Sequence, residues 1–175
     1  IERVVNGLTL AGGSIVKVNS NSVLSFSGGN QTLGGSGTIE LGSTGASNRA
    51  LSMEGNTTLT VGPNVVIHGV NGTIGQTYLS GGTQNLVNSG TINADGGGTI
   101  TVGVSGALTN DGLLRAQNGT LSVADPVSGS GTLQVDSTGV MNLANSPNTQ
   151  GKLVMGAAGS TLNIGTKNLT INTDY

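Results

Sequence analysis

One short phrase returns along the middle of the chain and constrains its fold more than any other feature. It joins a small polar residue and a glycine to an alternating segment, and its glycines stand at positions 90, 112 and 131. A second, interleaved phrase begins at positions 98, 119, 139 and 160. The first phrase repeats at steps of 22 and 19 residues, and the second at steps of 21, 20 and 21. Two phrases that share a period of about twenty predict an array of stacked structural units.

The phrases have the alternation of half-buried β-strands. In Thr99-Ile100-Thr101-Val102 the two aliphatic residues point to one face and the threonines to the other. A glycine opens most copies and supplies a corner where the chain turns. Two or three four-residue strands with their corners account for roughly twenty residues. We therefore predict an all-β fold, a single-stranded parallel β-helix (β-solenoid) with about twenty residues per coil. We expect it to be right-handed, from the chirality of parallel crossovers.

The interior of such a solenoid is a narrow apolar column, to which each coil contributes one layer. Small and branched aliphatic side chains fit this space, and the chain has only two tyrosines, one phenylalanine and no tryptophan. We predict three successive layers in the most regular part of the chain: Ile92, Ala94, Ile100 and Val102; then Leu114, Ala116, Leu121 and Val123; then Leu133, Val135, Met141 and Leu143.

Residues 1–175 are predicted to form a single solenoid segment with loops leaving its corners. The register breaks near 42–57, which we interpret as an excursion from one corner, and a shorter excursion is expected from Gln76 to Gln84. We expect Gly72–Gly75 to be a further copy of the first phrase, and Asn145–Gln150 to form a third loop. Three short strands are expected before the first excursion, at Leu8–Leu10, Ile15–Val18 and Val23–Phe26.

Composition excludes several partners. The net charge of −2 and the scarcity of aromatic residues argue against nucleic-acid binding. There is no cysteine for disulfides, and no apolar stretch of about 18 residues, so we expect no direct membrane insertion. The chain begins at Ile1 without an initiator Met or a signal peptide, and neither end resembles a polar cap. We interpret it as a piece of a longer chain, or as a unit that stacks end to end.

No catalytic, cofactor-binding or metal-ligating residues are predicted, and no cofactor. His68 is the single histidine and is expected to face solvent if Val65 and Ile67 face inward. Enzymes that cleave polysaccharides need two or three carboxylates on one face. Asp111 and Arg115 share one strand region, and we interpret Asp95 and Asp136 as following strands of different phrases, so no cluster is expected. The carboxylates are Glu2, Glu40, Glu54, Asp95, Asp111, Asp125, Asp136 and Asp174.

Two recurring polar patterns have structural and functional interpretations. Asn88 and Asn110 occupy the same place in successive phrases and are predicted to stack as an asparagine ladder, with hydrogen bonds from coil to coil. The pairs Thr58/Thr60 and Thr99/Thr101 resemble the Thr-x-Thr rows of ice-binding solenoids. Later coils interrupt the second row, because they carry Thr120/Ser122, Val140/Asn142 and Thr161/Asn163 there.

The phrases at 88–94, 118–123 and 129–135 resemble those of bacterial exported β-strand-repeat proteins. These include autotransporter passengers and the filamentous-haemagglutinin-like adhesins of two-partner secretion. The resemblance covers most of the chain, although any β-solenoid with such turns would share these phrases. The insertion at 42–57 and the lack of a signal or membrane anchor are departures from it. It implies a right-handed β-helix that serves as a rigid stalk, and no catalytic residues.

The sequence thus predicts a structural or adhesive stalk segment of a bacterial cell-surface or secreted protein, with no enzymatic activity. Its expected location is extracellular or on the bacterial surface, associated with the outer membrane. Its expected partners are other copies, stacked end to end into a fibre or matrix, and host or matrix glycans or proteins. One alternative is a polysaccharide-binding or polysaccharide-cleaving domain that uses the groove beside the 42–57 excursion. Another is an ice-binding or mineral-binding solenoid.

Overall fold

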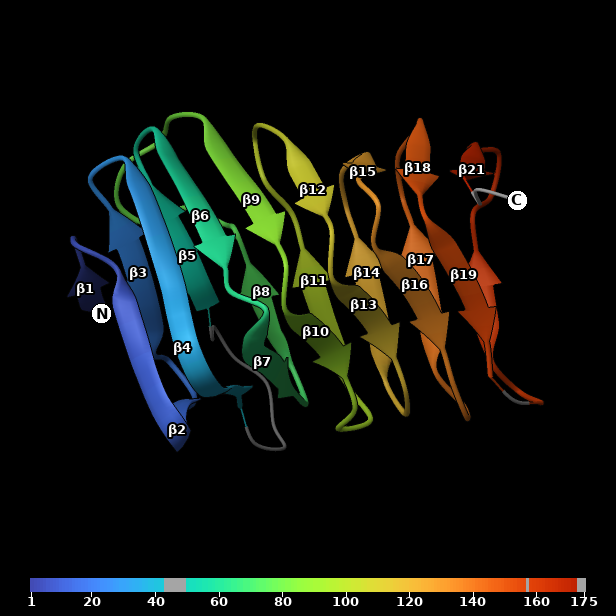
Figure 1. The fold of residues 1–175 in the computed structure, drawn as a ribbon, viewed down its shortest axis with the longest axis horizontal. Helices are drawn as coiled ribbons and strands as arrows, with labels where there is room; N and C mark the ends of the chain where they lie inside the picture. The colour runs from blue at the N-terminus through green and yellow to red at the C-terminus, as the bar shows by residue number, and fades with distance from the viewer. Residues whose placement is uncertain (43–49, 157, 173–175) are drawn as a thin grey trace.

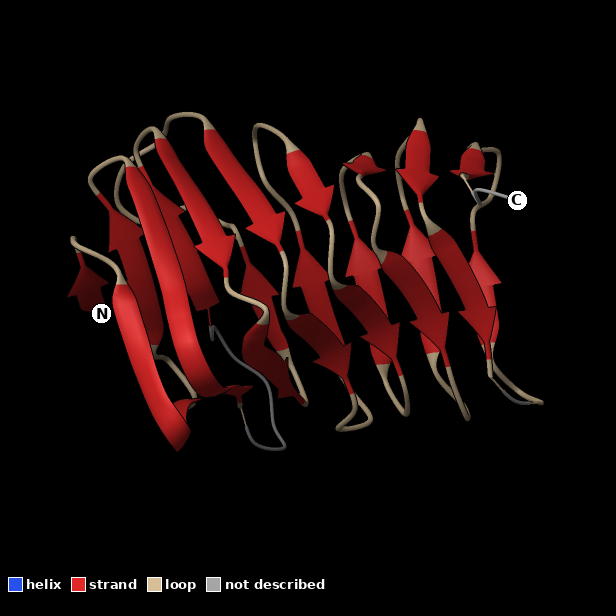
Figure 2. Ribbon diagram, viewed as in Figure 1, coloured by secondary structure: helices blue, strands red, loops and turns tan. Residues whose placement is uncertain are grey.

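The chain winds into a β-solenoid of about seven turns, with successive turns about 23 residues apart. The computed structural model describes residues 1–42, 50–156 and 158–172. Figure 1 shows the coils stacked along the long axis, from β1 at one end to β21 at the other. Figure 2 shows strands and loops throughout the part of the chain that is described, with no helix. The predicted fold class is confirmed.

The strands of the described residues are arranged in three sheets, two of them long. The 8-stranded sheet, sheet A, contains β1 (Glu2–Val4), β3 (Val23–Ser27), β5 (Ala50–Glu54), β8 (Gly72–Ile74), β11 (Thr99–Val102), β14 (Thr120–Val123), β17 (Val140–Leu143) and β20 (Thr161–Asn163). The 11-stranded sheet, sheet B, contains β2 (Leu8–Val18), β4 (Asn30–Leu41), β6 (Thr57–Val61), β7 (Asn64–Gly69), β9 (Gln84–Asn88), β10 (Thr91–Ala94), β12 (Leu108–Asn110), β13 (Leu113–Ala116), β15 (Val127–Ser128), β16 (Thr132–Val135) and β19 (Lys152–Met155). A 2-stranded sheet joins β18 (Asn148–Gln150) to β21 (Leu169–Ile171).

All neighbouring strands pair in parallel, and their register shows why the period varies. In the last coils of sheet A, Thr99 pairs with Thr120, which pairs with Val140, so the steps are 21 and 20 residues. Earlier steps are longer: Val23 pairs with Ala50 and Gly72 with Ile100, which are 27 and 28 residues apart. The second excursion supplies extra residues of the later step at the corner between β8 and β9. The strands therefore remain stacked although the chain length per coil changes.

The predicted apolar column is confirmed layer by layer. Ile92, Leu114 and Leu133 are register partners in sheet B, and Ile100, Leu121 and Met141 are partners in sheet A. The twelve side chains predicted for the three layers are at most 3% exposed. The column continues to the N-terminal coils, where Phe26 and Met53 face each other across the β3–β5 pair and are fully buried. Burial of this aliphatic surface is the main favourable contribution to folding.

Three expectations about local structure are corrected. Gly72–Ile74 is not a copy of the first phrase, because β8 pairs with β11 in sheet A and thus belongs to the column of the second phrase. Asn148–Gln150 is a strand rather than part of a loop, since it pairs with β21. The two strands expected at 8–18 form one strand, β2, with an irregularity between Leu10 and Ser14.

In the excursion predicted near 42–57, residues 43–49 lie outside the described residues, whereas β5 and β6 are regular coil strands.

The predicted asparagine ladder is present inside the solenoid. The Asn88 side-chain amide donates a hydrogen bond to Oδ1 of Asn110 at 2.8 Å, and both side chains are fully buried. The amide of Asn110 in turn donates to Oε1 of Gln150 at 2.6 Å, although 40 residues separate the two. This buried ladder therefore links the coils of β9, β12 and β18 by hydrogen bonds.

A glycine makes the longer step of this ladder possible. Asn110 follows Leu108 and Thr109, which pair with Val127 and Ser128, so its neighbour in the next coil is Gly129. With no side chain at that position, Asn110 reaches past it to Gln150 in the following coil. Gly129 has a φ of +126°, and a Cβ atom there would lie 2.3 Å from the carbonyl oxygen of Asn110. A side chain at position 129 would therefore strain the backbone. At Gly131 an added Cβ atom would lie 2.6 Å from the Asn110 amide nitrogen, so a side chain there would block the ladder.

Candidate functional site

The outer face of sheet B carries one continuous column of mostly polar side chains, which we call the polar column. Each member is the register partner of the next, so the side chains follow one another at the strand spacing of about 4.8 Å. The column consists of Lys17, Glu40, His68, Asn93, Arg115, Gln134 and Val154.

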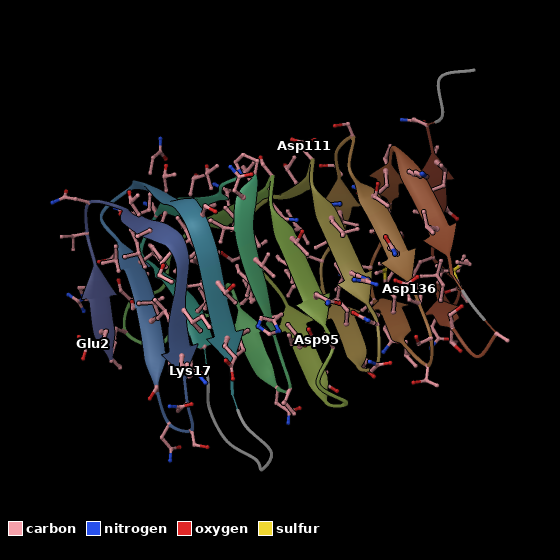
Figure 3. All side chains as sticks on the ribbon, turned by 60° about the horizontal axis from the view of Figure 1, so that its bottom comes forward. Glu2, Lys17, Asp95, Asp111 and Asp136 are labelled. Carbon is pink, nitrogen blue, oxygen red and sulfur yellow. The ribbon has the colours of Figure 1, made fainter. Side chains whose placement is uncertain are left out.

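Carboxylates at the corner beside this column pair with its members. His68 Nδ1 lies 3.0 Å from Asp95 Oδ2, and Arg115 Nε donates to Asp136 Oδ2 at 2.7 Å. Figure 3 shows Lys17, Asp95 and Asp136 spread along the rod, with Asp111 at its opposite edge. Asp95 and Asp136 follow β10 and β16, two coils apart in one column of strands, so the expectation that they follow strands of different phrases is wrong.

His68 lies where the sequence predicted it. Val65 and Ile67 are fully buried, and the His68 side chain is on the outer face with 31% of its surface exposed. Its position beside Asp95 makes it a member of a surface pair. Among the residues that the structure describes, no three histidine, cysteine, aspartate or glutamate side chains are grouped so that they could hold a metal ion.

Other carboxylates are tied to backbone groups near their own corners. Asp111 accepts hydrogen bonds from the backbone and the hydroxyl of Ser130, each at 3.0 Å, rather than pairing with Arg115. Asp125 accepts one from the N–H of Val104 at 2.7 Å. Glu2 lies in β1 at one end of the solenoid, and Asp174 is outside the described residues. The structure thus disperses the carboxylates among several corners.

Glu54 has the most distinctive environment of the acidic residues. Its buried carboxylate accepts hydrogen bonds from three successive backbone N–H groups, those of Tyr78, Leu79 and Ser80, at 2.7–2.9 Å. Burial acts to raise the pKa of this carboxyl group. The hydrogen bonds from those N–H groups outweigh burial, and the pKa lies below the ordinary value of 4.5. Glu54 therefore anchors the second excursion to the body of the solenoid.

Residues 43–49 lie outside the described residues, so the groove expected beside the first excursion stays a prediction. A surface hollow of about 400 Å³ lies at the corner between β5 and β6. Its lining includes Arg3, Glu54, Gly55 and Asn56. Glu54 is the one carboxylate among the described residues that line it, and three backbone N–H groups already hold that carboxylate. Glycoside cleavage requires a pair of carboxyl groups. The described lining of this hollow provides one.

The two threonine pairs lie on different sheets, because Thr58 and Thr60 are in β6 of sheet B and Thr99 and Thr101 are in β11 of sheet A. The row of Thr101 continues as Ser122, Asn142 and Asn163, as the sequence indicated. Sequence reasoning missed a second row on sheet B. It is one residue wide and runs through Thr32, Thr60, Val87, Thr109 and Ser128.

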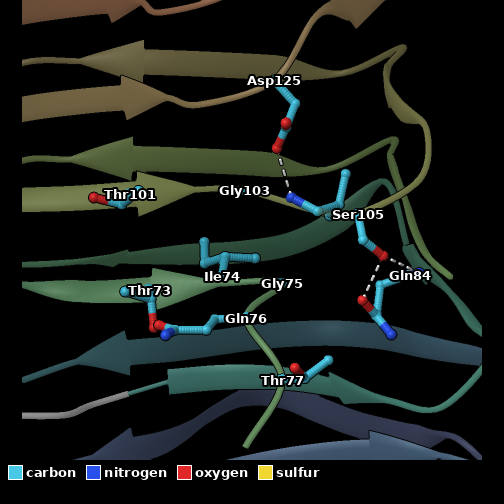
Figure 4. A pocket seen from close by; sticks show the side chains of 11 residues that line it. Thr73, Ile74, Gly75, Gln76, Thr77, Gln84, Thr101, Gly103, Ser105 and Asp125 are labelled. Carbon is cyan, nitrogen blue, oxygen red and sulfur yellow. Dashed lines mark hydrogen bonds between the residues drawn. The ribbon is translucent and has the colours of Figure 1, made fainter. Parts of the chain in front are cut away.

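A pocket of about 340 Å³ opens where the second excursion leaves sheet A, just after β8. Figure 4 shows it between the corners that follow β8 and β11, with Asp125 on the next coil. Its polar lining includes Gln76 and Thr77 of the excursion, Thr101 and Ser105 of the next coil, and Asp125. The sequence did not indicate this pocket, because its residues come from corners whose positions depend on coil-to-coil register.

Comparisons with known proteins do not assign a family. No protein-family model matches the sequence, and neither the curated proteins nor the solved structures include a significant match. Among the described residues, no helix is long and apolar enough to cross a membrane.

Proposed function

We propose that this chain is a structural and adhesive stalk segment of a bacterial cell-surface or secreted protein. The observation that supports this proposal best is the continuity of the solenoid. Parallel ladders and one buried aliphatic column extend from β1 to β20. Such a scaffold is rigid along its axis, because each coil is hydrogen-bonded to its neighbours and packed on them. A rod of this kind holds a binding surface at a fixed distance from its attachment point.

The distribution of charged groups favours a stalk over the polysaccharide-cleaving alternative. Asp111, Asp125 and Glu54 hold backbone groups in place, and Asp136 pairs with Arg115. Side chains used in this way stabilise the corners of the coils. The phrases that resemble exported β-strand-repeat proteins favour an extracellular or cell-surface location.

End-to-end association is a variant of this proposal. At the C-terminal end of the rod, Leu162 and Ile164 pack on the core but stay half-buried, and Val4 and Val16 do the same at the other end. A further coil on either end layer would complete their burial and pair the open strand edges. Either flanking sequence or a second copy supplies such a coil. Negative-stain electron microscopy over a concentration series tests the second source: thin unbranched fibres support it, and discrete particles at every concentration contradict it.

Rigidity is the property that the stalk requires, and it is directly measurable. Because the chain has no cysteine, Ile15→Cys and Lys152→Cys provide two unique spin-label sites. Both positions are exposed and belong to one column of register partners, six layers apart. At about 4.8 Å per layer, we expect a single narrow distribution of distances near 29 Å between the backbone positions. The pair Thr38→Cys and Lys152→Cys, one layer closer, is the matched control. A broad distribution for either pair would contradict a rigid stalk.

A further inference from the structure

The pocket after β8 is built from three successive coils. Gln76 and Thr77 enter it from the second excursion, Thr101 and Ser105 from β11 and the corner after it, and Asp125 from the corner after β14. Sheet A thus provides the floor, and the excursion forms a wall. The anchoring of that excursion by Glu54 fixes the wall relative to the floor.

The lining is held in place before any ligand arrives. Val104 donates its N–H to Asp125 Oδ2 at 2.7 Å, which fixes the carboxylate at one side of the pocket. Ser105 Oγ lies 2.6 Å from Oε1 of Gln84, whose amide donates to the carbonyl of Gly55 at 2.7 Å. Gln84 is only 3% exposed, so these bonds are shielded from water. Preorganised polar groups of this kind favour binding because less ordering is needed when a ligand enters.

Two glycines keep the pocket open. Gly75 has a φ of +100°, and a Cβ atom there would lie 2.2 Å from the carbonyl oxygen of Gly103. Gly103 has no side chain to fill the space in front of Asp125, since an added Cβ atom would lie 3.6 Å from its Oδ2 atom. The open space results from these two corners together with the early end of β8 at Ile74.

The chemistry of the lining selects a class of ligand. It contains one carboxylate, several hydroxyl and amide groups, and Val104, and the lining residues that the structure describes include no lysine, arginine or histidine. Such a surface disfavours anions. A carboxylate offers about four acceptor positions, of which the Val104 N–H uses one. Neighbouring hydroxyl groups on one small molecule can use the others. The volume of about 340 Å³ is at the low end of the range for small-molecule sites.

We propose that this pocket binds a single neutral monosaccharide unit. Asp125 accepts hydrogen bonds from the sugar hydroxyls, Thr101 and Gln76 exchange hydrogen bonds with the opposite edge of the ring, and the methyl groups of Val104 and Thr101 contact its C–H surface. This proposal does not depend on the stalk function, because it concerns one corner of the solenoid. It gives the rod a glycan contact on its side rather than at its end.

Amide chemical shifts of the isotope-labelled chain test the proposal by titration with neutral methyl glycosides of glucose, galactose, mannose and N-acetylglucosamine. We expect at least one glycoside to shift the resonances of Gln76, Thr77, Val104 and Ser105, with a dissociation constant of about 1 mM. Thr101→Val removes the hydroxyl and keeps the shape of the side chain, and should weaken binding about threefold. Asp125→Asn should weaken it about tenfold, because a hydrogen bond to a charged group is stronger.

Thr120→Val is the matched control, since Thr120 lies on the outer face of the next strand but does not line the pocket. It should leave the affinity unchanged. The proposal is overturned if none of the four glycosides shifts the pocket resonances at 50-fold the expected dissociation constant, about 50 mM. It is also overturned if Thr101→Val and Asp125→Asn bind as tightly as the parent chain while their other amide resonances show an intact solenoid. Tighter binding of methylammonium than of every glycoside would indicate a cation site instead. The spin-label distances measure the stalk separately.

Discussion

Replacement of Asn110 by alanine should lower the free energy of unfolding by about 3 kcal/mol. Its amide group accepts a hydrogen bond from Asn88 and donates one to Gln150, and all three side chains are fully buried. Alanine removes both bonds, together with a third from the Asn110 amide to the carbonyl of Thr132 at 3.3 Å, and leaves a small cavity. Oε1 of Gln150 then loses its 2.6 Å donor in a place that water does not reach. Urea unfolding followed by circular dichroism measures the change.

A surface pair in the same fold provides the control. Asn142 and Asn163 are register partners, as Asn88 and Asn110 are, but they lie on the outer face of sheet A, where Asn163 donates to Oδ1 of Asn142 at 2.8 Å. Asn163→Ala should cost about 0.5 kcal/mol or less, because water replaces the lost partner. Equal losses in the free energy of unfolding for the two variants would contradict the idea that burial makes the hydrogen bonds of the ladder more stabilising. The carbonyl groups of Leu113 and Thr132 accept hydrogen bonds from the amides of Asn88 and Asn110, so hydrogen exchange at these two residues should increase only in the Asn110 variant.

Replacement of Glu54 by glutamine should destabilise the attachment of the second excursion to the solenoid by about 2 kcal/mol at neutral pH. The carboxylate accepts three backbone N–H groups, whereas the amide of glutamine places a donor against at least one of them. Hydrogen exchange at Tyr78, Leu79 and Ser80 is the direct measurement, because the loss is concentrated in the excursion. Glu40→Gln is the control, since Glu40 pairs with the exposed Lys17 and contributes little.

The contribution of Glu54 should also depend on pH. Its pKa in the folded chain is lowered from the ordinary value of 4.5, so the unfolded chain binds the proton more readily. The stabilisation is therefore complete above pH 4.5 and is lost as the pH falls below 4.5 and through the folded-state pKa. The exchange rates of the parent chain and of Glu54→Gln should approach each other in that range. A difference that stayed constant from pH 7 to pH 3 would contradict the role of the ionised carboxylate.

Sequence reasoning reached the fold because a solenoid repeats a local pattern. Alternation places Ile100 and Val102 inside, and the period places Leu121 and Val123 on top of them. The same reasoning found Asn88 and Asn110, which occupy equal places in two phrases. It failed where local patterns look alike: Gly72–Ile74 resembles the first phrase but pairs in the column of the second. The candidate pocket was not found, because most of its lining residues come from corners rather than from the repeated phrases.

The sequence by itself determined the class of fold, the composition of the core and the absence of disulfides. These follow from alternation and period, which every coil repeats. Only the tertiary structure decided which polar side chains meet. Arg115 pairs with Asp136 rather than Asp111, Asn110 reaches Gln150 past a glycine, and Glu54 anchors an excursion that begins 22 residues later at Gln76. Such contacts depend on how the corner residues of neighbouring coils are placed relative to one another, which the repeated phrases do not specify.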